Sequence, residues 1–202
     1  MNIIKTNFSW NGSLSKRAAT NYIIIHHRAG NGDVNSIHSQ QLKNGWTGIG
    51  YHFYIRKDGS VYEGRPLDTV GAHTSGKNSV SIGICFEGNY ETQNAEMPTS
   101  QFNAGQELLA HLTTLYPSCE IKRHRDFQAT ACPGKYFPFE KILKYQKPYL
   151  TSASDITSTL NKLYFKIDDI SGFIHSLEKA KSENSPMYWG YYKLVNNIAS
   201  PQ

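Results

Sequence analysis

The stretch 21–27, N-Y-I-I-I-H-H, constrains the fold of this chain more than any other segment. It is a continuous apolar run built on β-branched isoleucines, and such a run predicts a buried strand. Two histidines, His26 and His27, end it. Successive side chains of a strand point to opposite faces, so only one of the two histidines can face a given site. The segment therefore predicts a central strand that carries one histidine to a functional surface.

Strand and helix signals alternate along the rest of the first 150 residues. Asp33 is a typical helix N-cap, Asn44-Gly45 a typical helix end, and Asp58-Gly59 a typical hairpin turn. The predicted elements after the first strand are a helix 33–42, a hairpin around Asp58-Gly59, a strand 79–86, a helix from Pro98 with apolar positions up to Leu115, a strand 120–123 and a helix 139–145. Interleaved strands and helices predict an α/β domain with a mixed central sheet flanked by helices.

A different pattern begins at about Thr151. Apolar residues then follow a strict 4-3 spacing, which places them on one stripe of a helix: Ile156, Leu160, Leu163, Ile167, Ile170, Ile174 and Leu177. Asn184-Ser185-Pro186 interrupts the stripe, and a shorter helical pattern follows. We therefore expect a first domain at 1–148 and a C-terminal α-helical hairpin at 151–202. About fifty residues bury little by themselves, so this region is expected to dock for stability, to bind the cell wall or to form a homo-oligomer.

Charge and composition narrow the classes of partner. The formal net charge of +5 suits a polyanionic partner such as nucleic acid or a bacterial cell wall, but the basic residues are scattered and form no nucleic-acid-binding arm. No stretch resembles a secretory signal or a membrane span. Cys85, Cys119 and Cys132 are odd in number and widely spaced, which argues against a disulfide framework. We expect synthesis in a reducing cytoplasm and neither a nucleic-acid partner nor a membrane span.

The segment H-R-D-F-Q-A-T-A-C-P-G, 124–134, carries the clearest candidate chemistry. His124 and Cys132 are compatible with a metal site, with a catalytic Cys–His couple, or with a buried cysteine near an unrelated histidine. A catalytic zinc site takes three protein ligands and leaves one position for water. His26 or His27 would supply the third ligand. Spacing alone leaves the three alternatives open.

Six segments in order resemble the zinc-dependent N-acetylmuramoyl-L-alanine amidases, a family that includes phage endolysins and the animal peptidoglycan recognition proteins. They are I-I-H-H (24–27), G-W-T-G-I-G-Y-H-F (45–53), D-G-S-V-Y-E-G-R (58–65), V-G-A-H-T-S-G-K-N (70–78), S-I-G-I-C-F-E-G (81–88) and the segment 124–134. The resemblance covers more than half of the chain and does not reach the last fifty residues. It implies the mixed-sheet fold of this family.

The resemblance also implies roles for individual residues. The family's zinc ligands fall on His26, His124 and Cys132, with one zinc ion per domain, and His27 is then expected to be packed or hydrogen-bonded on the other face. The two catalytic positions of the family fall on Tyr51 and Thr130, where Thr130 stands in place of the lysine of some phage amidases. Four further residues are expected at the substrate groove, although a structural role is an alternative for each: Trp46, Arg65, His73 and Asn78.

The activity implied by this resemblance is hydrolysis of the amide between N-acetylmuramic acid and the first L-alanine of the peptide stem in peptidoglycan. A phage or prophage endolysin is expected, stored in the cytoplasm and acting on the wall after release. The alternatives are a bacterial autolysin, a muropeptide-recycling amidase and a protein that binds peptidoglycan without cutting it. An intact set of three ligands favours an enzyme over the last of these.

Overall fold

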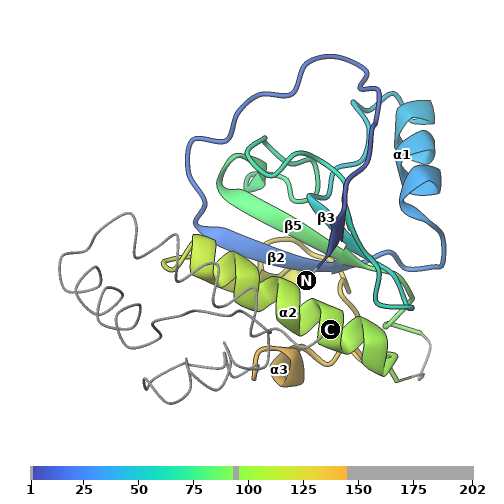
Figure 1. Cartoon of the computed structure of the whole chain (residues 1–202), viewed down its shortest axis with the longest axis vertical. Helices are drawn as coiled ribbons and strands as arrows, with labels where there is room; N and C mark the ends of the chain where they lie inside the picture. The colour runs from blue at the N-terminus through green and yellow to red at the C-terminus, as the bar shows by residue number, and fades with distance from the viewer. Residues whose placement is uncertain (1, 93–95, 145–202) are drawn as a thin grey trace, which may run out of the picture. The chain divides into compact units, whose positions relative to one another are not determined.

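A six-stranded mixed sheet forms the centre of the structure (Figure 1). The computed structural model describes residues 2–92 and 96–144, which belong to one unit of the chain. The strands are β1 (Ile3–Ile4), β2 (Tyr22–His27), β3 (Phe53–Ile55), β4 (Val61–Glu63), β5 (Ser81–Phe86) and β6 (Glu120–Arg123), in the order β1-β4-β3-β5-β2-β6. Among these six strands, β3 and β4 pair antiparallel and the other neighbours pair parallel. The predicted mixed α/β sheet is confirmed.

The local signals in the sequence produce the expected elements. Helix α1 (Val34–Lys43) begins at Asp33, whose carboxylate accepts from the Ser36 backbone N–H, and it ends at Asn44. The antiparallel pair β3–β4 turns at Asp58-Gly59, where Gly59 has a φ of 88° that favours glycine. Helix α2 (Thr99–Leu115) and the short helix α3 (Phe139–Ile142) also lie where they were predicted.

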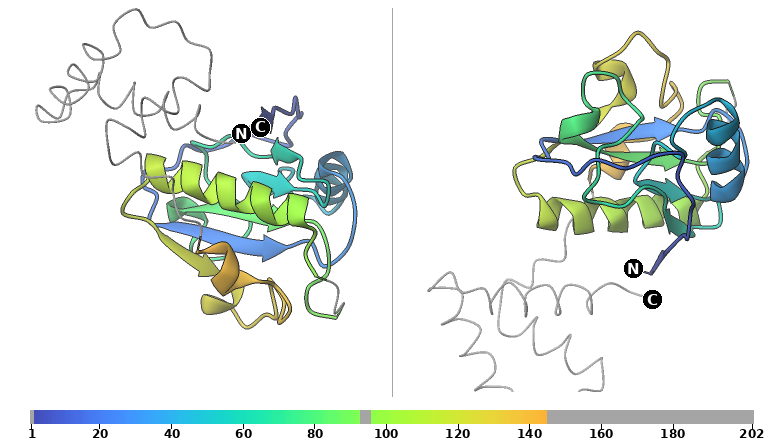
Figure 2. Two further views of the ribbon diagram at one scale, coloured as in Figure 1. Left: turned by 60° about the horizontal axis from the view of Figure 1, so that its bottom comes forward. Right: turned by 90° about the horizontal axis from the view of Figure 1, so that it is seen from above.

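The two faces of the sheet have different surroundings. Parallel β2 and β5 are in register, with His26 opposite Cys85 and His27 opposite Phe86. Helix α2 lies along one face of the sheet (Figure 2), and Phe86 points to this face, because its ring lies against Gly105 of α2. Gly105 allows this packing, because a Cβ at that position would meet the Phe86 ring at 2.8 Å. His26 and Cys85 consequently point to the opposite face of the sheet, away from α2.

Some details differ from the sequence prediction. Strand β5 begins at Ser81, not at residue 79, because a 3₁₀ turn, η1 (Asn78–Val80), precedes it. Strand β1 is two residues long and was not predicted. Helix α3 ends at Ile142, and the predicted C-terminal helices lie outside the described residues. Among the described residues, no helix is long and apolar enough to cross a membrane.

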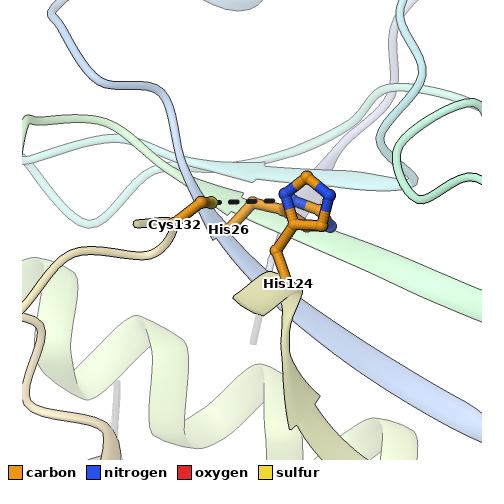
Figure 3. A group of neighbouring side chains, drawn as sticks. All are labelled: His26, His124 and Cys132. Carbon is orange, nitrogen blue, oxygen red and sulfur yellow. Dashed lines mark hydrogen bonds between the residues drawn. The ribbon is translucent and has the colours of Figure 1, made fainter. Parts of the chain in front are cut away.

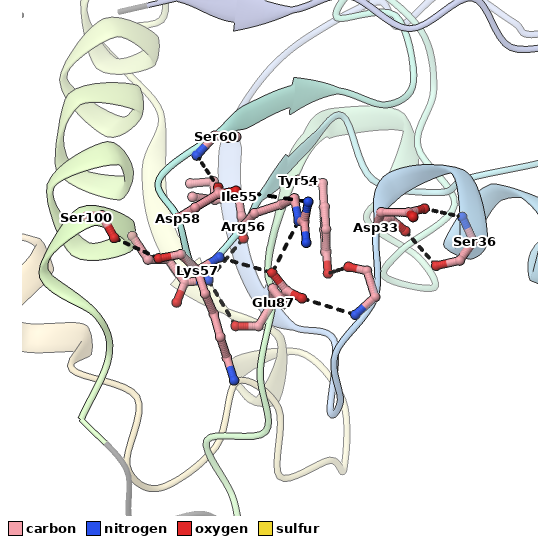
Figure 4. A network of polar contacts seen from close by, with 12 residues as sticks. Asp33, Ser36, Tyr54, Ile55, Arg56, Lys57, Asp58, Ser60, Glu87 and Ser100 are labelled. Atoms are coloured by element: carbon pink, nitrogen blue, oxygen red, sulfur yellow. Dashed lines mark hydrogen bonds and ion pairs between the residues drawn. The ribbon is translucent and has the colours of Figure 1, made fainter.

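A buried carboxylate at the end of β5 joins two loops (Figure 4). Glu87 is 5% exposed and accepts from the backbone N–H groups of Gly32, at 3.1 Å, and Lys57, at 3.0 Å. The guanidinium group of Arg56 lies 3.5 Å away. Tyr54 donates to the Gly32 carbonyl. Glu87 therefore ties the loop before α1 to the β3–β4 hairpin.

Candidate metal centre and active site

Three side chains, from the end of β2, the turn after β6 and the loop that follows it, meet on the sheet face opposite α2 (Figure 3). His26 stands near the end of β2, His124 begins the 3₁₀ turn η2 (His124–Asp126) after β6, and Cys132 lies on the following loop. One ligand atom from each lies within 4.8 Å of the others. Because β2 and β6 are parallel neighbours, their carboxyl ends reach the same edge of the sheet. The structure thus brings together the three predicted metal ligands.

Burial in the interior shifts the pKa values of His26 and Cys132. His26 is 1% exposed, and burial lowers the pKa of its imidazole well below the usual value, which favours the neutral form that binds metals. Burial raises the pKa of the Cys132 thiol to about 11, while the backbone N–H of His27, 3.4 Å from its sulfur, acts in the opposite direction. A metal binds the thiolate form of Cys132, so its binding must displace the proton of this thiol.

The donor set fits zinc. Two imidazoles and one thiolate are ligands that zinc prefers, and three protein ligands leave a position open. The Nδ1 atom of His26 lies 3.8 Å from the sulfur of Cys132. In a tetrahedral zinc site, typical bond lengths place such a nitrogen and sulfur about 3.5 Å apart. The three groups are therefore close to the separation that a shared zinc ion requires.

The second histidine of the pair lies on the other face of the sheet. His27 accepts from the Tyr90 backbone N–H at 3.0 Å through Nδ1, and its ring stacks near that of Tyr90. This agrees with the expectation of a packed, hydrogen-bonded residue. His73, by contrast, lies on the side of the site and is 7% exposed, with its Nδ1 atom 3.0 Å from Nε2 of His26. It contacts a candidate ligand directly.

The two predicted catalytic residues border the cluster. The ring of Tyr51 lies 5.2 Å from that of His26, measured between centroids. Burial, with the Cys85 and Cys132 thiols nearby, raises the pKa of the Tyr51 phenol well above its usual value. Thr130 is exposed, and its hydroxyl oxygen accepts from the Cys132 backbone N–H at 3.2 Å. The Tyr51 ring thus lies beside that of His26, and the Thr130 hydroxyl lies next to Cys132.

The other residues expected at the substrate groove divide into two kinds. Trp46 is 50% exposed and presents a large apolar surface. Arg65 is 4% exposed and donates to the carbonyls of Ile49 and Val70 and to the Thr47 hydroxyl. The Asn78 side-chain oxygen accepts from the backbone N–H groups of His73 and Thr74, at 2.8 Å each. These contacts favour structural roles for Arg65 and Asn78, whereas the Trp46 ring is free to contact a ligand.

Three residues near the cluster were not singled out by sequence reasoning. Gln128 lies with its side-chain oxygen 2.6 Å from Nε2 of His124. Thr74 and Ser81 both contact His73. Gln128 is four residues after a predicted ligand, and this spacing was the only signal in the sequence. Thr74 and Ser81 are common polar residues whose role depends on the fold.

Residues 16–135 match the family described as N-acetylmuramoyl-L-alanine amidase. This match covers more than half of the chain and includes all three residues of the cluster. This chain belongs to the N-acetylmuramoyl-L-alanine amidase family. The sequence resemblance to this family is therefore confirmed.

Relatives of this amidase include both phage and animal proteins. An endolysin of Klebsiella phage KP32 is 35% identical over 127 residues, which cover 59% of this chain and 84% of the phage protein. Peptidoglycan recognition protein 1 of Bos indicus is 38% identical over 132 residues, 58% of this chain and 68% of that protein. Sequence similarity thus relates the chain to two groups of peptidoglycan proteins.

Solved structures give the same family relationship. The N-acetylmuramoyl-L-alanine amidase LysC from Clostridium intestinale URNW matches with a TM-score of 0.67 and 39% identity, over 70% of this chain and 95% of LysC. Drosophila PGRP-LB matches with a TM-score of 0.63 and 26% identity, over 71% of this chain and 94% of that structure. Together with the family match, these relatives identify the chain as an enzyme, an N-acetylmuramoyl-L-alanine amidase.

Proposed function

We propose that this amidase is zinc-dependent and hydrolyses the amide between N-acetylmuramic acid and L-alanine in peptidoglycan. The cluster of His26, His124 and Cys132, with ligand atoms within 4.8 Å of one another, carries the proposal. Its donor set suits a zinc ion with one open coordination position. A protein that only binds peptidoglycan has no need of such a cluster.

The chemistry follows from the groups around the proposed zinc site. When bound, zinc polarises a carbonyl and lowers the pKa of water towards 7. The Tyr51 phenol stays protonated, and its ring lies beside that of His26, so we assign it to donate to oxygen atoms at the site. Thr130 accepts from Cys132 through its oxygen, which leaves its own O–H to donate towards the exposed side. We assign both hydroxyls to stabilising the oxyanion of the tetrahedral transition state.

We propose that exposed side chains contact the substrate. Trp46 presents an apolar face that suits a sugar ring or a peptide stem. Arg65 and Asn78 act on the substrate indirectly in this proposal, because they hold the loops at Thr47 and His73.

An endolysin is the biological role that we propose. Its support is the similarity to phage proteins named endolysin and the basic composition, with a net charge of +5 that favours an anionic wall. The enzyme would act on the wall after release from the cytoplasm. We propose a domain boundary at about residue 150 and assign residues 151–202 to wall binding or self-association.

The reaction is tested on purified peptidoglycan. We expect the zinc-loaded chain to release new L-alanine amino termini, and a chelator to stop this release until zinc is added back. No new L-alanine amino termini in the presence of zinc would refute the assigned bond. Cleavage that continues at full rate after complete removal of metal would refute the zinc dependence.

Two comparisons test the biological role. An endolysin or autolysin should act on intact walls, whereas a muropeptide-recycling enzyme should act mainly on small soluble fragments. Deletion of residues 151–202 should spare cleavage of soluble fragments and reduce wall binding or oligomer mass. Unchanged wall binding and unchanged mass in solution would refute the proposed role of this region.

A further inference from the structure

The outer nitrogen atoms of both candidate ligand histidines contact polar side chains. The Nε2 atom of His26 lies 3.0 Å from Nδ1 of His73, and the Nε2 atom of His124 lies 2.6 Å from the side-chain oxygen of Gln128. The other ring nitrogen of His26, Nδ1, is the atom 3.8 Å from the Cys132 sulfur. These contacts determine which ring nitrogen of each histidine carries the proton.

For His26, the answer follows from a hydrogen-bonded chain that ends on a backbone carbonyl. Ser81 has a single hydroxyl proton, and it donates this proton to the Lys77 carbonyl at 2.7 Å. Its oxygen can then only accept from His73, whose Nε2 atom is 3.4 Å away. A neutral His73 with its proton on Nε2 has an acceptor at Nδ1. His26 must therefore donate to it from Nε2, and its own Nδ1 is left without a proton, facing Cys132.

The side chains of this hydrogen-bonded chain are buried and closely packed, which restricts any change in their orientation. His73 is 7% exposed, Thr74 1% and Ser81 0%. Gly71 and Gly83 make room for the His73 ring, because a Cβ on Gly83 would approach the ring within 2.6 Å and one on Gly71 within 2.5 Å. The Thr74 hydroxyl lies 3.0 Å from Nδ1 of His73 and 3.4 Å from Nε2 of His26, and as donor and acceptor it accommodates this proton arrangement.

For His124, the contact with Gln128 alone determines which ring nitrogen carries the proton. The side-chain carbonyl oxygen of Gln128 can only accept, so the Nε2 atom of His124 must donate to it. A neutral imidazole that carries its proton on Nε2 has its lone pair on Nδ1. The two histidines therefore reach the same protonation pattern through unrelated partners, one on the loop after β4 and one on the loop after η2.

We propose that His73, supported by Ser81, and Gln128 are positioning residues that hold both ligand histidines with the proton on Nε2. In this tautomer each histidine presents an unprotonated Nδ1 to the metal before the metal arrives. The inference rests on the proposed zinc site. It assigns His73 to orienting His26 instead of binding substrate. Hydrogen bonds of this kind typically raise metal affinity 10- to 100-fold.

The first test compares zinc affinities of full-length variants by competition with a coloured chelator. Gln128→Leu should weaken zinc binding about 10- to 100-fold, whereas Gln128→Glu keeps an acceptor and should stay near wild type. His73→Phe should weaken zinc binding to a similar degree. Circular dichroism of the metal-free proteins checks that each variant is folded. Equal zinc affinities for Gln128→Leu and Gln128→Glu would overturn the role of Gln128.

A milder variant tests the longer chain if His73→Phe does not fold. Ser81→Ala removes the acceptor that fixes the His73 proton and should weaken zinc binding roughly 2- to 10-fold, the equivalent of one hydrogen bond. Ser79→Ala is the matched control, since this exposed serine lies in the 3₁₀ turn next to Ser81. Equal affinities for the two serine variants would overturn the role of Ser81.

Long-range proton–nitrogen NMR spectra of the zinc-loaded full chain give a readout that does not depend on activity. The assigned rings of His26 and His124 should both carry the proton on Nε2. A proton on Nδ1 of either ring would overturn the proposal even if zinc binds tightly. Failure of the wild-type chain to bind zinc would instead refute the proposed function, and this inference with it.

Discussion

His52 is expected to make this amidase sensitive to acid. Its ring is 0% exposed, Nδ1 accepts from the Gly83 backbone N–H at 3.0 Å, and Nε2 lies 2.9 Å from the Thr69 carbonyl. A second proton, on Nδ1, would break the bond from Gly83 and place a charge in the interior near Arg17 and Arg65. Burial, the largest cause, lowers the pKa of His52 from 6.5 to about 3.

The size of the effect follows from proton linkage. Above pH 6.5 both the folded and the unfolded states hold His52 neutral, so it contributes no pH dependence. Between pH 6.5 and about 3 the unfolded state binds a proton that the folded state does not, and the free energy of unfolding falls as the pH falls. At pH 5 this single residue should remove about 2 kcal/mol of stability relative to neutral pH.

The assay is urea unfolding of the metal-free full chain between pH 5 and 7.5, with His52→Gln as the comparison. Glutamine keeps one acceptor and one donor but does not titrate. His52→Gln should be less stable at neutral pH and should lose about 2 kcal/mol less than wild type between pH 7.5 and 5. Identical pH dependence in both proteins would refute the reasoning.

Four further substitutions test other parts of the structure. Cys132→Ser should abolish turnover and weaken zinc binding; normal zinc content and turnover would contradict the ligand assignment. Tyr51→Phe should keep zinc, measured by metal analysis, and slow turnover about 100-fold. Unchanged turnover would show that the Tyr51 hydroxyl serves only in packing. Glu87→Ala leaves two half-buried backbone donors without their acceptor, removes the ion pair with Arg56, and should cost about 3 kcal/mol in urea unfolding while zinc content stays the same. Gly83→Ala should push the His73 ring aside and lower zinc affinity measured by chelator competition; wild-type affinity would show that the ring has room to move.

The sequence predicted the elements whose signals are local. The Asp33 cap, the Asp58-Gly59 turn and the apolar run of β2 each act within a few residues, and the structure has the predicted element at each place. The pairing of β2 with β6 involves residues about a hundred positions apart, and periodicity carries no information about it. The family resemblance, not the spacing, selected His26 over His27.

The polar contacts of the site could not be predicted from the sequence, because they depend on how the folded chain brings distant residues together. Arg65 and Asn78 are polar residues on loops, and the sequence does not show that their polar atoms are directed to backbone groups. Burial of His73 depends on Gly71 and Gly83, which are brought together only by the folded chain. Gln128 resembles any surface glutamine until its oxygen is seen beside His124.

The pairing of β2 with β6 also sets the order in which the enzyme can be completed. His26 leaves the ribosome long before His124 and Cys132, so the ligand set is complete only after β6 has joined the sheet. Such distant contacts form late and slowly in folding. A zinc ion bound by all three residues would lock that final step, since metal binding adds to folding stability. Zinc uptake during refolding should therefore report on the addition of β6 to the sheet. A chain whose synthesis has not yet passed Cys132 would be inactive.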